Sequence, residues 1–348
     1  MNCTNLSSTT NQTFPVKSQP VSITVLICLF LMTGFLLNIF SLWVFKYRTP
    51  GWKSGTVLQF HLAISDLSLC PLGPFLAVNF TKGYWPFGHL MCRLKIALLF
   101  VHFYSSIFFL TLISIHRYVS VVYHSQEFRM QQKDFVKKLC LGVWAFILTN
   151  GVVYCLLLGA SGKDEHMLCY SIHQTDYKEK YFALNFVLLI PGFLIPFMIS
   201  VVCYSRLARS VSSINVCHLK GRQMKNKSRK MIAVCLLIFV VCFSPFHVIQ
   251  SVMVVVNKFY PDLCNLLLKL ETLYYASWIL FTANCYLDPL IYCFASQNFM
   301  AAFRSSMRKI RVRFQSTHEN TDHDSPQTTY VTPTPRMTKR ENMSMTHL

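Results

Sequence analysis

Long stretches without a charged side chain recur along the chain, and polar segments separate them. A helix that crosses a bilayer needs about 20 consecutive, mostly apolar residues. Seven stretches meet this requirement, and only two of them contain a charged residue, Asp66 or Asp288: Val21–Phe45, Thr56–Phe80, Ile96–Ile115, Leu139–Gly162, Tyr181–Ser205, Met231–Asn257 and Thr272–Phe303. This pattern predicts an all-α membrane protein, a bundle of seven transmembrane helices.

Composition and charge agree with this interpretation. The chain is 53% hydrophobic and 14% charged, too apolar a balance for a soluble domain of 348 residues. Its net charge of +19 is concentrated in alternate loops, above all between Arg206 and Lys230, which argues for a role in topology and against nucleic-acid binding. The positive-inside rule places those loops in the cytoplasm, so the N-terminus is expected outside the cell and the C-terminus inside.

The predicted outer side carries two kinds of modification signal. Asn2, Asn5 and Asn11 each begin an Asn-X-Ser/Thr sequon in the outer tail, so all three are expected to be glycosylated. Four cysteines fall on the same oxidising side and can form disulfides: Cys3, Cys92, Cys169 and Cys264.

Two acids lie within the predicted membrane helices. Asp66 is in the second helix, and Asp288 precedes Pro289 in the seventh, where the proline frees a backbone carbonyl. A carboxylate at bilayer depth is costly, so it normally has a partner or a function. These acids and nearby polar side chains predict an oxygen-rich site for a small cation or for protons, the alternative being an acid pair without an ion. The predicted site comprises Asp66, Ser106, Asn284 and Asp288.

The cytoplasmic end of the third helix carries the sequence His116-Arg117-Tyr118. From there Arg117 can project into a cavity that opens only when neighbouring helices move. Cys92 lies about 37 Å away along the same helix at 1.5 Å per residue, which places it at the outer end.

These motifs together resemble the rhodopsin-like family of G-protein-coupled receptors, and the resemblance extends roughly from Val21 to Arg313. Asp288 stands where asparagine is commoner, which looks like the branch that contains purinergic, leukotriene, lysophospholipid and proton-sensing receptors. His116 stands where the motif usually has an acid, so Arg117 is expected to lack that ionic partner and basal activity to be raised. The residues that match the family's activation motifs are His116, Arg117, Tyr118, Tyr204, Phe243, Pro245, Asp288, Pro289 and Tyr292.

The resemblance implies a function and several pairings. It implies a multi-pass receptor in the plasma membrane, without enzymatic activity, that binds an extracellular ligand and activates a heterotrimeric G protein. It also implies the disulfides Cys92–Cys169 and Cys3–Cys264. A sodium ion is the one cofactor expected, at the Asp66 pocket.

Four segments make up the expected organisation: a glycosylated outer tail over 1–20, the receptor domain over 21–296, a short amphipathic eighth helix over 297–313 and a disordered cytoplasmic tail over 314–348. Phosphorylation of the tail is expected to recruit arrestin. Its end, Thr346-His-Leu348, is a candidate ligand for a PDZ domain.

A ligand cavity is expected between helices three, five, six and seven. Gln250 stands where nucleotide receptors of the branch carry a basic residue, so an anionic lipid or other apolar acid is the preferred ligand, with Lys95 at the rim to meet its charge. A nucleotide, a small metabolite, a peptide or the proton are the alternatives. Helical spacing selects as lining residues Lys95, Leu99, His102, Phe103, His247, Gln250, Tyr274, Tyr275 and Trp278.

Two other classes of membrane protein fit the sequence less well. An intramembrane enzyme would need paired catalytic aspartates or a motif such as HExxH, and Asp66 with Asp288 is the only dyad. A transporter built from duplicated halves would show an internal repeat, and none is present.

Overall fold

The computed structural model describes residues 20–123, 128–162, 167–170, 174–212, 219–295, 299–301, 303–309 and 311–312. The chain divides into two units, Met1–Phe303 and Arg304–Leu348. The predicted glycosylation sites, the arrestin-recruiting tail and the terminal PDZ motif lie outside the described residues, so they stay predictions. Within the predicted eighth helix, residues 299–301, 303–309 and 311–312 are helical.

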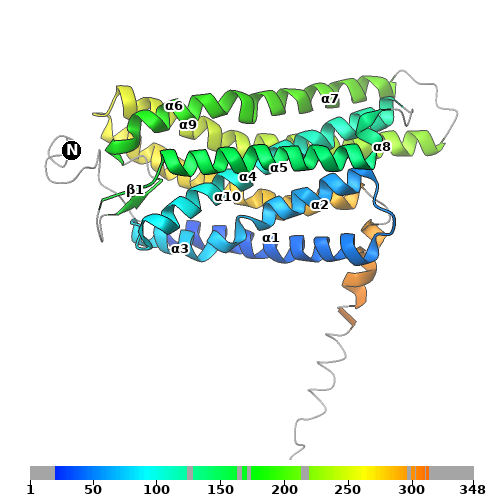
Figure 1. The fold of residues 1–348 in the computed structure, drawn as a ribbon, viewed down its shortest axis with the longest axis horizontal. Helices are drawn as coiled ribbons and strands as arrows, with labels where there is room; N and C mark the ends of the chain where they lie inside the picture. Colours follow the sequence, from blue (N-terminus) through cyan, green and yellow to red (C-terminus); the bar gives the residue numbers. More distant parts are fainter. Residues whose placement is uncertain are drawn as a thin grey trace, which may run out of the picture. The chain divides into compact units, whose positions relative to one another are not determined.

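Helices that run side by side form nearly all of the first unit (Figure 1). A few short π and 3-10 segments (η) interrupt them. In chain order the elements are α1 (Val21–Arg48), α2 (Ser54–Leu67), η2 (Cys70–Leu72), α3 (Gly73–Lys82), α4 (Gly88–Val122), η3 (Arg129–Gln131), α5 (Lys133–Leu157), β1 (Ala160–Ser161), β2 (Leu168–Cys169), η5 (Thr175–Tyr177), α6 (Lys178–Leu189), η6 (Ile190–Leu194), α7 (Ile195–Ser212), α8 (Leu219–Ile238), η7 (Phe239–Phe243), α9 (Ser244–Phe259) and α10 (Cys264–Ala295).

The predicted transmembrane helices are present. Among the described residues, six helical segments are long and apolar enough to cross a membrane: Val21–Arg48, Ser54–Lys82, Gly88–Val122, Lys133–Leu157, Lys178–Arg209 and Asn226–Phe259. The seventh predicted span is α10, whose 32 residues exceed the required length although Asp288 and Pro289 lie inside it. The boundaries differ in places: the fourth span ends at Leu157, before the predicted Gly162, because the chain turns there into the strand β1, and α10 begins at Cys264, before the predicted Thr272.

Prolines explain why three of the spans are segmented. Proline has no N–H and its ring clashes with the preceding turn, so the helix adjusts locally to a 3-10 or π geometry. Pro71 lies in η2, Pro191 lies in the π segment η6, and Pro245 follows directly after the π segment η7. Such π segments often occur at functional sites, and η6 and η7 both lie next to the cavity described below.

A pair of short strands covers one end of the bundle (Figure 1). β1 and β2 are antiparallel, and Ala160 lies opposite Cys169. Cys169 forms the expected disulfide with Cys92 near the start of α4, with the two Cα atoms 5.7 Å apart. Cys264 is also disulfide-bonded, and Cys3, its predicted partner, lies outside the described residues.

The central helix of the bundle is α4. In its most apolar stretch 72% of residues are buried, against 22–44% for the other five apolar spans. The outer helices instead expose large apolar side chains such as Leu36, Leu141 and Val187. A surface of this kind is favourable only against lipid. Because lipid offers no hydrogen-bond partners, the polar groups of the protein lie in the interior, around α4.

A close helix contact joins α1 to α10. Asn38 donates one hydrogen bond to the Gly34 carbonyl (3.0 Å) and one to the Cys285 carbonyl (2.8 Å). A Cβ atom on Gly34 would lie 2.9 Å from the Cβ of Cys285 and 3.2 Å from its carbonyl carbon. Only glycine therefore fits at position 34 without moving a helix backbone.

We expect Gly34→Ala to lower the free energy of unfolding by about 1–3 kcal/mol, the usual cost of overpacking. The measurement is the thermal unfolding midpoint of the purified receptor in detergent. Gly142→Ala on α5 is the matched control, because a Cβ there meets nothing within 4 Å. The control should be neutral or slightly stabilising, since alanine favours helix more than glycine does. Equal midpoints for both variants would contradict the close contact.

Candidate functional site

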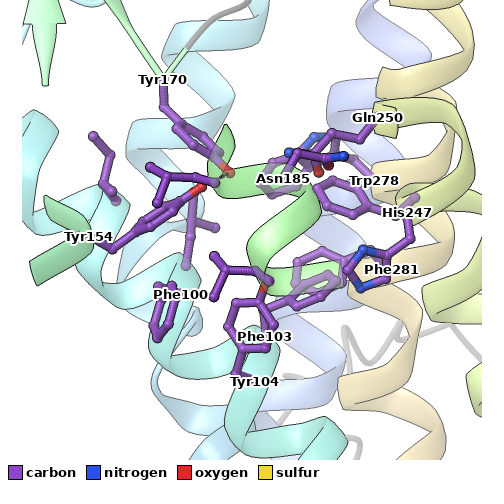
Figure 2. Close-up of a pocket in the computed structure, with 15 residues that line it drawn as sticks. Phe100, Phe103, Tyr104, Tyr154, Tyr170, Asn185, His247, Gln250, Trp278 and Phe281 are labelled. Atoms are coloured by element: carbon purple, nitrogen blue, oxygen red, sulfur yellow. Dashed lines mark hydrogen bonds between the residues drawn. The ribbon is translucent and has the colours of Figure 1, made fainter. Parts of the chain in front are cut away.

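A cavity lies between α4, α5, α6, α9 and α10, beneath the strand pair. About 540 Å³ of it is free of protein atoms. Figure 2 shows Tyr154 and Tyr170 on one side and His247, Gln250 and Trp278 on the other. We call it the aromatic cavity, and none of its lining residues is charged: Ile96, Leu99, Phe100, Phe103, Tyr104, Tyr154, Tyr170, Leu184, Asn185, Leu188, Phe246, His247, Gln250, Trp278 and Phe281.

The inner wall of the aromatic cavity is built around Phe103 on α4. Its ring centroid lies 4.9 Å from that of His247, 5.0 Å from that of Phe281 and 5.2 Å from that of Phe246. It also packs edge-on against Phe243, one of the residues that match the family's activation motifs, with the ring centroids 5.5 Å apart. A ligand that reaches Phe103 is therefore one aromatic contact away from a predicted activation residue.

Neutral polar groups line the rest of the aromatic cavity. The hydroxyls of Tyr154 and Tyr170 are 3.0 Å apart, and Asn185 donates to the Ser251 hydroxyl at 3.0 Å. His247 is 5% exposed, and its Nε2 atom has no hydrogen-bond partner among the described residues. An unsatisfied buried polar atom costs about 1–3 kcal/mol, so a ligand that hydrogen-bonds to Nε2 recovers this energy.

Lys95 lies in a second, smaller cavity, which we call the Lys95 cavity. Its Nζ atom donates to the Cys169 carbonyl at 3.2 Å and lies 4.7 Å from the centroid of the Trp85 ring. Lys95 is 3% exposed, and no carboxylate pairs with it among the described residues. It is the one charged residue in a lining of Leu76, Asn79, Phe80, Gly83, Lys95, Leu168, Cys169, Tyr170, Tyr274, Tyr275 and Trp278.

The single predicted cavity is thus two. Leu99, Phe103, His247, Gln250 and Trp278 line the aromatic cavity, whereas Lys95, Tyr274 and Tyr275 line the other together with Trp278. Tyr170 and Trp278 belong to both linings and form the shared wall. His102, a predicted lining residue, lines neither cavity, because its ring points into the bundle interior.

Sequence reasoning missed several lining residues, Tyr170 and Tyr104 above all. Tyr170 directly follows Cys169, so the disulfide could have placed it; its φ of 52° lies in the left-handed region that side chains seldom adopt. Tyr104 packs on Gly192 of η6, where a Cβ atom would clash with its ring. Pro191 indicates an irregular helix at η6, but which side chain packs on Gly192 depends on how α4 lies against this segment.

His102 belongs to what we call the buried polar cluster, with Asp66, Ser106, Asn284, Cys285 and Asp288. All six are fully buried. The Ser106 hydroxyl donates to Asp66 Oδ1 at 3.3 Å, and the Asp66 and Asp288 carboxyl groups lie close enough to interact. Three of the four residues of the predicted cation site therefore contact one another, and Asn284 contacts Cys285, which the sequence did not indicate as part of the site.

The arginine motif at the inner end of α4 is held by a contact with α2. His116 Nε2 and the Ser54 hydroxyl are hydrogen-bonded at 2.8 Å. Gly55 leaves the space for this ring, since a Cβ there would lie 2.9 Å from His116 Cε1. Arg117, the next residue in the chain, is half-buried and also interacts with another group of the protein. The histidine thus joins two helices at the position where the family usually has an acid.

Three further motif residues lie on the same half of the bundle. Tyr118 and Tyr204 pack against an apolar cluster of Val121, Leu207 and Ile232. Tyr292 is fully buried, with its ring 5.3 Å from that of Phe45 and no hydrogen-bond partner for its hydroxyl among the described residues.

An aromatic cavity at one end of a helical bundle and an arginine motif at the other are the features of a membrane receptor. Residues 37–292 match the family model "7 transmembrane receptor (rhodopsin family)", and the chain belongs to this family. It is accordingly a G-protein-coupled receptor of the cell surface that binds an extracellular ligand, and not an enzyme.

Relatives in the purinergic and lipid branch agree with the predicted placement. The chain is 30% identical to purinoceptor 4 of Mus musculus over 298 residues, which are 83% of this chain and 79% of that protein. It is 28% identical to lysophosphatidic acid receptor 6 of Homo sapiens over 300 residues, 84% and 87% of the two chains. With cysteinyl leukotriene receptor 1 of Mus musculus it shares 29% identity over 270 residues, 77% and 76% of the chains.

We expect Gly55→Ala to displace the His116 ring and destabilise the receptor by about 1–3 kcal/mol. In a His116→Ala background the same substitution should cost under about 0.5 kcal/mol, because the atom it meets is gone. Thermal midpoints of the four receptors of this double-mutant cycle provide the measurement. Additive effects would show that the two side chains do not touch.

Proposed function

We propose that the ligand is an apolar molecule with one acidic group. The observation that carries this proposal is an uncharged aromatic cavity directly beside a buried lysine that has no carboxylate partner among the described residues. The aromatic cavity suits a hydrocarbon or ring system, and Lys95 suits a carboxylate or a phosphate.

Lys95 is placed to bind an anion. A buried ammonium group is costly unless it is paired, and the Trp85 ring and one carbonyl offset only part of that cost. Lysine has three donors, and the carbonyl of Cys169 takes one of them. An incoming anion would complete the set of partners of Lys95.

The ligand would extend across the wall between the two cavities. Tyr170 and Trp278 line both, so an acid at Lys95 and an apolar body at Phe103 require these two side chains to move apart. Tyr170 is suited to this, because its left-handed backbone conformation is strained and a shift of the loop relieves it.

The presence of one cation in the two cavity linings favours a ligand with one acidic group over a nucleotide. A nucleotide with several phosphates needs several basic residues, and the two cavity linings contain only Lys95. Two of the relatives are named as receptors for lysophosphatidic acid and cysteinyl leukotriene, and the first of these ligands is an acid by name. This resemblance supports an acidic lipid, and the purinoceptor relatives make a nucleotide the competing candidate.

We further propose that the N-terminus is extracellular and the C-terminus cytoplasmic, as the basic loops indicate. Arg117 would then face the G protein. Arrestin, recruited by the phosphorylated tail, and a PDZ domain at the terminal residues are proposed as additional partners.

Acidic lipids should activate the receptor, and their uncharged counterparts should not. The assay is guanine-nucleotide exchange on a purified G protein, with lysophosphatidic acid compared with the monoacylglycerol that lacks its phosphate, and with nucleoside triphosphates in parallel. Against an active acidic lipid, Lys95→Ala should lose about 1.5–3 kcal/mol, or roughly 10- to 150-fold in potency, and Lys95→Arg should lose less.

Lys82→Ala is the control for this prediction, because Lys82 lies at the same end of the bundle and contacts only Tyr84 in the described chain. Coinciding dose–response curves for wild type and Lys95→Ala would remove Lys95 from the ligand site. A response to nucleotides alone would favour the competing ligand class.

Arg117→Ala should abolish nucleotide exchange while the receptor still reaches the cell surface, because Arg117 belongs to the cytoplasmic motif and not to the hydrophobic core. Exchange rates and surface labelling are measured on the same cells. Arg93→Ala, an exposed arginine at the outer end of α4, is the control and should keep its exchange rate. Full exchange by Arg117→Ala would contradict the assigned role.

A further inference from the structure

The buried polar cluster contains three metal-ligating groups of different chemistry. The Asp66 carboxylate on α2, His102 Nε2 on α4 and Cys285 Sγ on α10 all lie within 4.8 Å of one another. The Nε2 and Sγ atoms are 3.7 Å apart. A tetrahedral zinc ion, with Zn–N near 2.0–2.1 Å and Zn–S near 2.3 Å, would hold those two atoms about 3.6 Å apart.

The tautomer of His102 leaves the correct nitrogen available. Its Nδ1 atom is 3.1 Å from the backbone carbonyl of Ser65. A carbonyl oxygen can only accept a hydrogen bond, so Nδ1 carries the proton and Nε2 carries the lone pair that faces Cys285. Metal-binding histidines usually have this second contact, which fixes the ring and its tautomer.

Asp288 lies beside Asp66, next to the three ligating groups. It is fully buried and interacts with Asp66, yet neither of its carboxyl oxygens has a hydrogen-bond partner among the described residues. Asp66 Oδ2 likewise has no hydrogen-bond partner among the described residues. No basic side chain pairs with either acid in the described part of the chain. Two acids at this depth are stabilised by a cation between them.

Two of the three converging groups do not suit the sodium ion that the family resemblance implies. Sodium is a hard cation that takes oxygen ligands, and two of the groups that meet in the cluster offer a nitrogen and a sulfur. Imidazole and thiolate are the ligands of zinc and other borderline metals. We propose that the cluster binds a thiophilic divalent cation such as Zn²⁺, held by Asp66, His102 and Cys285, with Asp288 beside Asp66.

Binding would have a structural consequence. The three ligands come from α2, α4 and α10, so the ion would join three helices at the centre of the bundle. Cys285 binds as the thiolate, and its proton leaves to solvent, so affinity should fall as the pH is lowered. Because the ion binds only where the three helices meet in this arrangement, it stabilises this arrangement over any in which they separate.

The test uses the full-length receptor in lipid nanodiscs, first stripped of metal with a chelator. Co²⁺ is the spectroscopic probe, because a bound thiolate gives it a charge-transfer absorption band, and Zn²⁺ is the competitor. Wild type should bind one Co²⁺ with this band and lose it to Zn²⁺, and Zn²⁺ should raise the thermal midpoint. Cys285→Ala should lose the band, whereas Cys140→Ala, which removes a buried thiol of α5 outside the cluster, should keep it.

His102→Gln is the second variant, because it removes the ligand of α4 and leaves the Cys285 thiol and its contact with Gly34 in place. This variant should bind Co²⁺ at least tenfold more weakly. The proposal is overturned if wild type shows no thiolate band, if the band survives in Cys285→Ala, or if Na⁺ but not Zn²⁺ raises the midpoint. Nucleotide exchange by the metal-free receptor reports on the receptor function separately, so the two proposals can fail independently.

Discussion

A carboxylate at bilayer depth has to find its partners inside the protein, because lipid offers none. Asp66 meets this constraint on α2, and the helices around it are arranged accordingly. The Ser106 hydroxyl reaches it from α4 and Asp288 faces it from α10. α1 joins the same region through Asn38, which hydrogen-bonds the Cys285 backbone across the close contact at Gly34. The helix that supplies Ser106, α4, is also the most buried of the apolar spans.

The aromatic cavity and the buried polar cluster are separated by a single aromatic layer. Phe281 lines the cavity and packs on the His102 ring with centroids 5.3 Å apart. Phe103 lines it too and contacts Phe243, at the end of the π segment η7. Packed cores rearrange between discrete states and do not deform continuously, so a ligand that shifts these rings would favour a different packing of α4, η7 and α10. The aromatic cavity, the buried polar cluster and Phe243 are thus linked by one continuous series of contacts.

The inner end of α4 shows how a substituted motif residue acquires a different partner. His116 cannot form the ion pair that an acid would form with Arg117. The structure instead bonds it to Ser54 at the start of α2, in a space that exists because position 55 is glycine. Reading the motif by itself indicated only a missing ionic partner. The hydrogen bond depends on a residue 62 positions away in the chain.

The membrane class, the seven spans, the acids within them and the cysteine pair of β2 and α4 could all be predicted from the sequence. Charge-free length, loop charge and motif order are local properties, and the bilayer imposes them on any spanning helix. The contacts between helices could not be predicted in this way. Lys95, Leu99 and His102 share one helical face, yet they lie in two cavities and one polar cluster, because the neighbours of each level come from other helices. Helical spacing determines which face of its helix a residue lies on, and the packing of the bundle determines which residues it contacts there.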